Sequence, residues 1–219
     1  MSSSKLEDQR SNTERTRENY HHGNLRTALI AGATDIIRQG GAEALSLRAL
    51  AATIGVTHRA SSAHFRNKDA LVAAVLTNAY ERLDRKLENA LNVLEAPAVE
   101  QIVQAIATAY GAFARNEGEL FLLMNGRRMN ASGEHVDLER ALQRVFGRVA
   151  DAFSSKGIKK ARLVELKSGK QDGELIALHV WACLSGVLVQ RALGRIRVRD
   201  DLFETYMRDT AIRIAQGIR

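Results

Sequence analysis

The chain has 219 residues, of which 45% are apolar and 5% aromatic, with a single proline and a formal net charge of +7. The apolar fraction suffices for a hydrophobic core, and the scarcity of aromatic residues and proline argues against a β-rich fold. The positive charge suits a polyanionic partner without identifying one. Because Cys183 is the only cysteine, an intramolecular disulfide is excluded, and we expect a packed core thiol in a reducing compartment.

The first 19 residues, MSSSKLEDQRSNTERTREN, have almost no apolar content and indicate a disordered arm. Arg10, Arg15 and Arg17 in this arm could enter a DNA minor groove, although a solvated tail is the more ordinary alternative. The arm lacks the apolar core of a signal peptide, and the most apolar run, Val180–Val189, is too short to span a bilayer. We therefore expect a soluble, cytoplasmic protein with no membrane partner.

Three helical patterns follow the arm. The first covers about residues 25–40, where apolar side chains recur at helical spacing until Gly40 and Gly41 end the helix. The second covers about residues 47–54 with Ser46 as its N-cap, and the third runs from Thr57 to residue 64 or 65.

Residues 46–68 read SLRALAATIGVTHRASSAHFRNK and are the most informative stretch of the chain. Gly55 permits a sharp turn after one capped helix, and Val56 is the apolar residue expected between this helix and the next. We expect Ala60 and Phe65 to face inward. The positions then left exposed are Thr57, His58, Arg59, Ser61, Ser62 and His64. This arrangement is typical of a helix-turn-helix whose second helix reads bases.

Six further helices are expected over about 68–94, 97–115, 119–130, 134–154, 174–193 and 201–214, with Pro97 in the first turn of one of them. A loop over 155–173 includes the basic segment Lys156–Lys170, for which a solvated loop is favoured over a partner contact. With no clear strand, the sequence predicts an all-α fold of about nine helices. The expected domains are a disordered arm (1–19), a DNA-binding helix-turn-helix domain (20–67) and a regulatory and dimerisation domain (68–219).

The helix expected over 174–193 is apolar on more than one face, so it needs cover both from its own domain and from a second subunit. Small residues along it, such as Ala182 and Gly186, would let another helix approach closely. We therefore predict a symmetric dimer through this helix and the last one. The expected interface residues are Leu184, Leu188, Arg191, Tyr206 and Ile214.

Together these features resemble the tetracycline-repressor (TetR) family of bacterial transcription regulators. The resemblance is strongest over residues 20–80. It rests on YHHGNLR at 20–26, SLR at 46–48, GVT at 55–57, HF at 64–65 and NKDAL at 67–71. The opening YHHGNLR is similar to a subgroup that also carries a W-x-x-x-H-G element, which Trp181 and Gly186 match while Ser185 stands where histidine is usual. The second half of the reading helix carries Ser61 and Ser62 where the family usually has a bulky apolar residue or proline and then a tyrosine.

The resemblance implies a homodimer that binds a near-palindromic operator in double-stranded DNA, with one reading helix in each of two successive major grooves. Arg59 is the first candidate for reading a guanine, and Lys68 resembles the phosphate-binding lysine of the family. The predicted DNA-binding residues are Ser46, Arg48, Thr57, His58, Arg59, Ser62, His64 and Lys68. Such a regulator is expected in the bacterial cytoplasm, and at the nucleoid when bound to DNA.

The resemblance also implies a small-molecule effector that enters the regulatory domain and changes the separation of the two reading helices. An apolar or amphipathic ligand and repression as the mode of control are expected. Candidate pocket residues are Tyr110, Phe113, Phe121, Met124, Phe146 and Trp181, although apolar residues at helical spacing are more often plain core.

Two alternatives stay open within this class of protein: a DNA-binding module controlled by a protein partner, and a family member whose specific DNA binding is weakened or lost through Ser61 and Ser62. A pocket of several hundred Å³ would favour a small ligand, whereas a sealed core would favour a protein partner. An enzyme is not expected, because the sequence offers no nucleophile–base pair, metal-ligand spacing or phosphate-binding glycine loop. We also expect no cofactor and no metal, since His21 and His22 are adjacent and would point apart on a helix.

Overall fold

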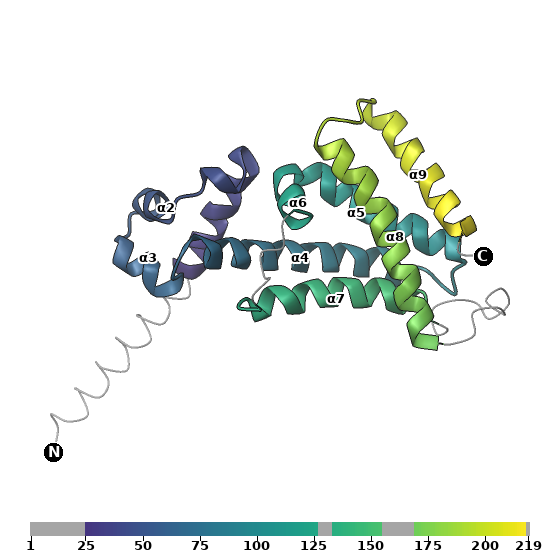
Figure 1. Ribbon diagram of the computed structural model, residues 1–219, viewed down its shortest axis with the longest axis horizontal. Coiled ribbons are helices and arrows are strands. Elements are labelled where there is room, and N and C mark those ends of the chain that lie inside the picture. The colour runs from purple at the N-terminus through teal and green to yellow at the C-terminus, as the bar shows by residue number, and fades with distance from the viewer. Residues whose placement is uncertain (1–24, 127–132, 155–168, 218–219) are drawn as a thin grey trace, which may run out of the picture. The chain divides into compact units, whose positions relative to one another are not determined.

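The computed structural model describes residues 25–126, 133–154 and 169–217, with the backbone alone over 169–172. Every regular element in these ranges is a helix, which confirms the predicted all-α fold class (Figure 1). The chain divides into two compact units, Met1–Val75 and Leu76–Arg219. The predicted arm over 1–19, His21, His22 and the side chains of the basic segment Lys156–Lys170 lie outside the described residues.

The smaller unit is built from short helices around a single apolar core. Its elements are a helix over residues 25–40, the 3₁₀ helix η1 (Ala42–Ala44), α2 (Leu47–Ile54), α3 (His58–His64) and the first turns of α4 (Lys68–Asn92). The core side chains recur at helical spacing and include Leu29, Ala33, Ile37, Leu50, Ala51, Phe65 and Leu71. Because one face of each helix is used up in this core, the polar faces of α2 and α3 remain at the surface.

The larger unit contains most of α4 and five further helices. These are α5 (Val99–Asn116), α6 (Gly118–Met124), α7 (Val136–Ala152), α8 (Gly169–Ala192) and α9 (Asp200–Gly217). The helix α5 packs along α9 and α7 packs along α8, while α8 also contacts α5 and α6 (Figure 1). Aromatic rings fill the centre, where Tyr110 lies edge-on to Phe121 with ring centroids 5.3 Å apart and stacks on Trp181 at 4.6 Å.

The helix boundaries follow the sequence pattern closely, with two instructive differences. The helix α5 begins at Val99 rather than at Pro97, because Ala98 is its N-cap and donates its N–H to Gln101 Oε1 at 2.8 Å. The helix α8 begins at Gly169, inside the segment that was predicted as a loop. The first residues of α8 are polar, so apolar periodicity does not indicate its first turn.

Ion pairs tie α4 to α7. The guanidinium of Arg148 on α7 donates to Asp84 Oδ2 at 3.0 Å and to Glu88 Oε1 at 3.1 Å on α4. The hydrogen bond to Asp84 is the main reason that the pKa of Arg148 is raised. One turn away, Arg144 donates to Glu81 at 3.2 Å. Charge-assisted pairs of this geometry set the register between the two helices.

The contact between α7 and α8 depends on a glycine. Gly173 is buried, and a Cβ atom at this position would lie 2.8 Å from the carbonyl oxygen of Ala150 on α7. Real Cβ atoms do not come this close to a backbone oxygen, so any larger residue would push the two helices apart.

The helix α8 is apolar on more than one face, and its buried side differs from our expectation. Leu184 and Leu188 are 0% and 1% exposed, so they belong to the core of their own chain and not to a dimer interface. The outer side carries Leu175 and Leu178, which are 58% and 53% exposed. We call Leu175, Leu178, Ala182 and Gly186 the α8 stripe, since all four are exposed at a spacing of three or four residues.

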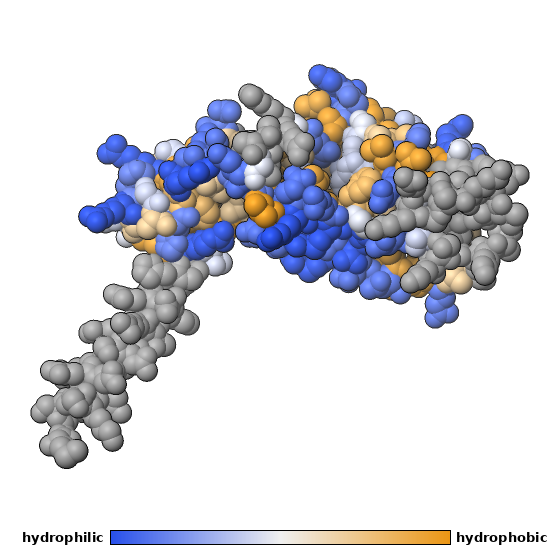
Figure 2. All heavy atoms as spheres, turned by 60° about the horizontal axis from the view of Figure 1, so that its bottom comes forward, coloured by the Kyte–Doolittle hydropathy of each residue, from blue (hydrophilic) through white to orange (hydrophobic). Residues whose placement is uncertain are grey.

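One further expectation about α8 is corrected. Cys183 is exposed beside the α8 stripe and is not a packed core thiol. The segment Gly173–Ala192, which is longer than the run Val180–Val189, is long and apolar enough to cross a membrane by length and composition. A core helix of a soluble protein meets the same criteria. Hydrophobic side chains reach the surface of the larger unit in several places (Figure 2).

Candidate nucleic-acid interface

Two capped helices make up the candidate reading element. At the start of α2, Ser46 Oγ accepts a hydrogen bond from Ala49 N at 3.4 Å, and at the start of α3, Thr57 Oγ1 accepts one from Ala60 N at 3.2 Å. Each bond satisfies a backbone donor that a helix leaves unpaired in its first turn. Each hydroxyl therefore turns a lone pair toward its own helix and keeps its O–H to donate outward. Phosphate oxygens, which only accept hydrogen bonds, match such donors.

The turn between the helices requires Gly55. Its φ of 80° and ψ of 26° lie in the left-handed region, which an L side chain rarely adopts. In this conformation the backbone N–H of Val56 donates to the carbonyl of Ala51 at 2.9 Å and closes the end of α2. The predicted helix-turn-helix is thus confirmed, with the glycine where the sequence predicts it.

The first turn of α3 presents polar side chains to solvent. His58 and Arg59 are exposed, and Arg59 forms no hydrogen bond or ion pair with any described residue. Ser62 is half-buried, and its hydroxyl lies 3.4 Å from His58 Nε2. The N-terminal end of a reading helix is the part that contacts base edges in a helix-turn-helix. An unengaged guanidinium there can donate two hydrogen bonds to a guanine.

The inner side of α3 differs from the predicted one. Ser61 is fully buried, whereas Ala60, which was expected to face inward, is only half-buried. The hydroxyl of Ser61 donates to the carbonyl of His58 at 2.8 Å, so the buried position does not leave an unsatisfied polar group. Ser61 therefore belongs to the core with Phe65 and lies away from the side predicted to face DNA. Of the two serines Ser61 and Ser62, only Ser62 remains on that side.

The other predicted contact residues flank α3. Ser46 and Arg48 are exposed, and His64 is half-buried at the last turn of α3. Lys68 Nζ lies 4.0 Å from Glu43 Oε2, with the carboxylate side chain of Glu43 fully exposed. An ion pair this long and this exposed contributes little to stability, so a phosphate can replace the carboxylate.

Sequence reasoning gave no contact role to one cation near α3. The guanidinium of Arg26 lies 5.3 Å from the centroid of the Phe65 ring, where the ring face attracts it. Arg26 and Arg66 are exposed, so they add positive charge beside Lys68 at the junction of α3 and α4. Arg26 stands in the quoted YHHGNLR element, but no local spacing connects it with α3.

A comparison with protein families decides what this element is. Residues 29–75 match the model of the bacterial regulatory proteins of the tetR family. The helix-turn-helix unit is similar to that of the tetR-family regulators. The match includes all of α2, the Gly55 turn and α3, so the chain is a DNA-binding protein of transcription regulation. No curated protein matches the chain.

Solved structures share the fold of this chain over most of its length. A protein with unknown function from Rhodococcus sp. RHA1 superposes with a TM-score of 0.69 at 28% identity, covering 91% of this chain and 95% of that one. A protein from Mesorhizobium loti MAFF303099, provisionally assigned as a TetR-family transcriptional regulator, gives 0.65 at 19% identity, covering 90% and 96%. The transcriptional regulator FadR from Bacillus subtilis, in complex with stearoyl-CoA, gives 0.59 at 9% identity, covering 88% and 96%. At their identities the last two show a shared fold alone.

Among the described residues of the larger unit, two cavities are considered. One, of about 400 Å³, is lined by residues of α5, α8 and α9. The other, of about 670 Å³, is lined mainly by residues of α7 and α8 and includes Phe146 and Trp181, two of the predicted pocket residues. Both volumes fall in the range of about 300–1,000 Å³ that is usual for small-molecule sites.

The remaining predicted pocket residues line neither of these cavities. Tyr110, Phe113 and Phe121 are fully buried, and the ring of Tyr110 packs edge-on against that of Phe121. Met124 is half-buried, and its carbonyl accepts a hydrogen bond from the hydroxyl of Tyr80 at 3.1 Å. These side chains therefore belong to the core that is packed between the helices.

A polar network lies within this core. The hydroxyl of Tyr110 donates to Asn125 Oδ1 at 3.3 Å and lies 3.1 Å from Ser185 Oγ. Because a phenol has one proton, donation to Asn125 leaves Ser185 as the donor in the second bond. Burial raises the pKa of Tyr110, although these two hydrogen bonds act in the opposite direction. Ser185, at the position where the resemblance predicts a histidine, is thus fitted to a buried tyrosine.

Proposed function

We propose that the chain is a dimeric transcriptional repressor of the bacterial cytoplasm, which leaves its operator when a small molecule binds. The observation that carries this proposal is the capped, exposed first turn of α3 within the tetR match. There Thr57 can donate to a phosphate while His58 and Arg59 reach the bases. The burial of Ser61 speaks against the alternative of lost DNA binding, because α3 is formed and capped without a bulky residue at that position.

The α8 stripe supports the dimer. Its leucines are more than half exposed, and its alanine and glycine allow the backbone of another helix to come close. On α9, Leu202 and Tyr206 are 53% and 48% exposed, so apolar surface continues on the second proposed interface helix. Ile214 of the predicted interface is half-buried. Arg191 forms hydrogen bonds within its own chain and so is assigned to the α8–α9 turn.

The cavity of about 400 Å³ supports control by a small molecule over control by a protein partner, because a sealed regulatory core would be expected for the latter. FadR from Bacillus subtilis, a protein with the same fold, is described in complex with an amphipathic molecule, stearoyl-CoA. An apolar or amphipathic effector is therefore our proposal for this chain. Its binding would favour the conformation with lower operator affinity.

The test is a selection of binding sequences from random duplex DNA by the full chain at two salt concentrations. We expect a near-palindromic consensus with two half-sites about one helical turn apart. Arg59→Ala should lose or relax one position in each half-site, whereas Arg38→Ala, which removes an equal charge from an Arg paired with Asp35 on the first helix, should keep the consensus. Weak binding without a consensus that disappears at the higher salt concentration would contradict the proposal.

A further inference from the structure

The cavity between α5, α8 and α9 has an apolar wall and a charged end. Its apolar wall is formed by Ala107 and Gly111 of α5, Leu188 of α8, and Phe203 and Met207 of α9. Ala107, Leu188 and Met207 are buried, so this wall is a continuation of the protein core. A molecule with an apolar body can occupy such a space without leaving polar groups unpaired.

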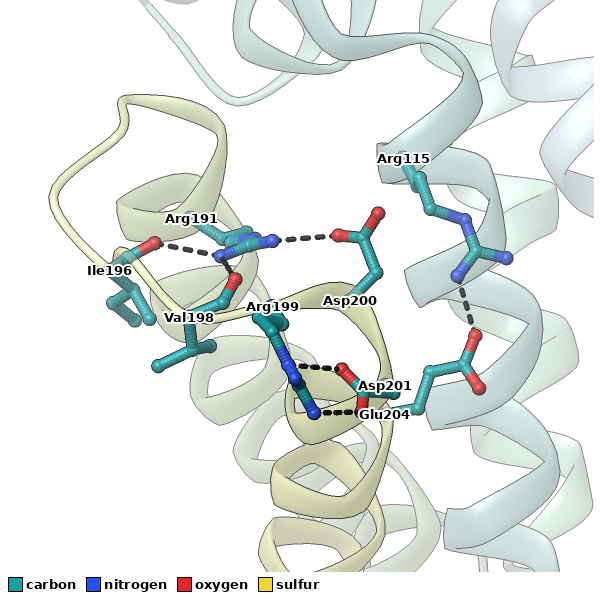
Figure 3. Close-up of polar contacts among 8 residues, drawn as sticks. All are labelled: Arg115, Arg191, Ile196, Val198, Arg199, Asp200, Asp201 and Glu204. Carbon is teal, nitrogen blue, oxygen red and sulfur yellow. Dashed lines mark hydrogen bonds and ion pairs between the residues drawn. The ribbon is translucent and has the colours of Figure 1, made fainter.

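Three arginines and two carboxylates form the charged end of the cavity. Figure 3 shows Arg115 of α5 and Glu204 of α9 turned toward one another, with Nη1 and Oε1 at 2.7 Å. Arg191 pairs with Asp200. The third arginine, Arg208, is exposed and has no ion-pair partner among the described residues. The cavity end therefore carries one more positive than negative group.

The two ion pairs at this end differ in how firmly they are held. Arg191 donates to the carbonyls of Ile196 and Val198 as well as to Asp200 (Figure 3). Its guanidinium also lies 4.9 Å from the centroid of the Phe203 ring. Arg191 thus fixes the turn between α8 and α9, and its guanidinium is already occupied by hydrogen bonds within that turn.

Arg115, in contrast, has Glu204 as its single side-chain partner among the described residues. The side chains of Arg115 and Glu204 are 51% and 63% exposed, and ion pairs of such exposure contribute little to stability. A ligand anion can therefore replace Glu204 on Arg115 at small cost. The neighbouring Arg208 supplies a second cation for the same anion.

We propose that this cavity is the effector site and that it binds a carboxylate with an apolar chain. The carboxylate takes the place of Glu204 beside Arg115 and Arg208, and the chain lies along Gly111, Leu188 and Met207. Release of Glu204 removes an ion pair between α5 and α9, the two helices that pack along each other. The regulatory consequence rests on the proposed function, whereas the binding site stands on the cavity itself.

The test uses octanoate, octanol and octylamine as matched probes, titrated into the full chain by calorimetry. We expect octanoate to bind about tenfold more tightly than octanol, the difference expected of one charge-assisted contact, and octylamine to bind more weakly still. Equal affinity for octanoate and octanol, or no binding of octanoate, would overturn the proposal.

Substitutions of the ion pair test the charged end. Arg115→Gln should lower octanoate affinity toward that of octanol, with Arg208 keeping part of the preference. Glu204→Gln should raise octanoate affinity because it removes the competing carboxylate. Asp201→Asn is the charge-matched control, since Asp201 pairs with Arg199 and lies outside the cavity lining (Figure 3). A rise of equal size in Asp201→Asn would mean that net charge alone attracts the anion, which contradicts the proposed site.

A pair of glycines tests which cavity is used. Gly111→Leu should abolish octanoate binding, since a Cβ at Gly111 meets only Leu188 Cδ2 at 3.9 Å and the rest of the side chain enters the cavity. Gly147→Leu fills the second cavity instead, has no neighbour within 4 Å of its Cβ, and should leave binding unchanged. The reverse result would place the ligand in the second cavity. Should Gly111→Leu not fold, the exposed Arg115 and Glu204 variants decide the question.

DNA binding by the same samples separates the two proposals. If octanoate does not bind while the DNA consensus persists, the site proposed here fails and the proposed repressor stands. If octanoate binds with the expected variant effects but no DNA consensus is found, the site stands and the proposed repressor fails.

Discussion

The hydroxyl of Ser61 donates to the carbonyl of His58, and this bond lets a serine occupy the buried side of the reading helix. The family resemblance predicts a bulky apolar residue or proline near this position. In this chain the core beneath α3 is instead completed by Phe65, which is 3% exposed. The small residue therefore reflects a core packed from neighbouring positions and not a defect in α3.

A first prediction follows for Ser61. Ser61→Leu should lower the free energy of unfolding of the N-terminal unit by roughly 1–3 kcal/mol, because the position is closed and the extra carbons overpack it. Ser61→Ala should be nearly neutral, since both the hydroxyl and its need for a partner are removed. Urea unfolding monitored by circular dichroism measures both. A Ser61→Leu variant as stable as the wild type would show that the core beneath α3 has spare room.

Lys68 should act on all DNA sequences alike. Lys68→Ala is expected to weaken binding to specific and non-specific duplexes by similar factors and to reduce the salt slope by about one, as the loss of one phosphate contact requires. Glu43→Gln should have the opposite, smaller effect, because it removes the carboxylate that faces Lys68. Fluorescence anisotropy over a series of KCl concentrations measures both slopes. A change in base preference for Lys68→Ala would assign this lysine to the bases instead.

Cys183 reports on the proposed dimer. As the only cysteine, exposed beside the α8 stripe, it should react with a maleimide more slowly as the protein concentration rises and the dimer forms. Leu178→Lys should restore fast labelling. Val136→Lys, at an apolar position on α7 that is 51% exposed, should not. Sedimentation of the same samples gives the dimer fraction. Fast labelling in a fully dimeric sample would place the interface elsewhere.

The buried tyrosines make stability depend on alkaline pH. Burial raises the pKa of both Tyr80 and Tyr110 above the ordinary value of 10.0. As pH rises past about 10, the unfolded chain loses these protons and the folded chain keeps them, so stability should fall by up to about 1.4 kcal/mol per pH unit for each tyrosine. Below that pH the two tyrosines should not change the free energy of unfolding with pH.

Unfolding midpoints from pH 8 to 11 test this expectation. Tyr110→Phe should show a shallower decline than the wild type, because one of the two raised groups is missing. Tyr80→Phe, at the other buried tyrosine, should show a shallower decline in the same way. An equal slope in all three proteins would assign the alkaline loss of stability to other groups.

The parts of the fold that local chemistry decides were accessible from the sequence. Ser46, Gly55 and Thr57 mark the ends of α2 and the start of α3 because each acts on its own backbone through a cap or a left-handed φ. Which side of α8 faces the core was not accessible in this way. A helix that is apolar on more than one face has no clear periodicity to separate Leu184, which is buried, from Leu178, which is exposed.

The cavity beside Arg115 was equally hidden from the sequence. Arg115 and Glu204 are 89 positions apart, and neither stands in a motif. Helical spacing instead indicated the aromatic residues Tyr110 and Phe113 as candidate pocket residues, and both are buried in the core. Contacts between distant helices are decided by packing, which periodicity alone does not describe.

The α8 stripe is composed of leucine, alanine and glycine side chains at Leu175, Leu178, Ala182 and Gly186. Such a surface discriminates poorly among similar partners, because selective pairing depends on features that penalise the wrong partner. A cell that makes several regulators with comparable stripes would form mixed pairs unless charges elsewhere prevent them. The exposed Asp209 and Arg213 of α9 are suited to that task. Exchange of α9 between two such regulators would then redirect which chains associate while leaving both reading helices intact.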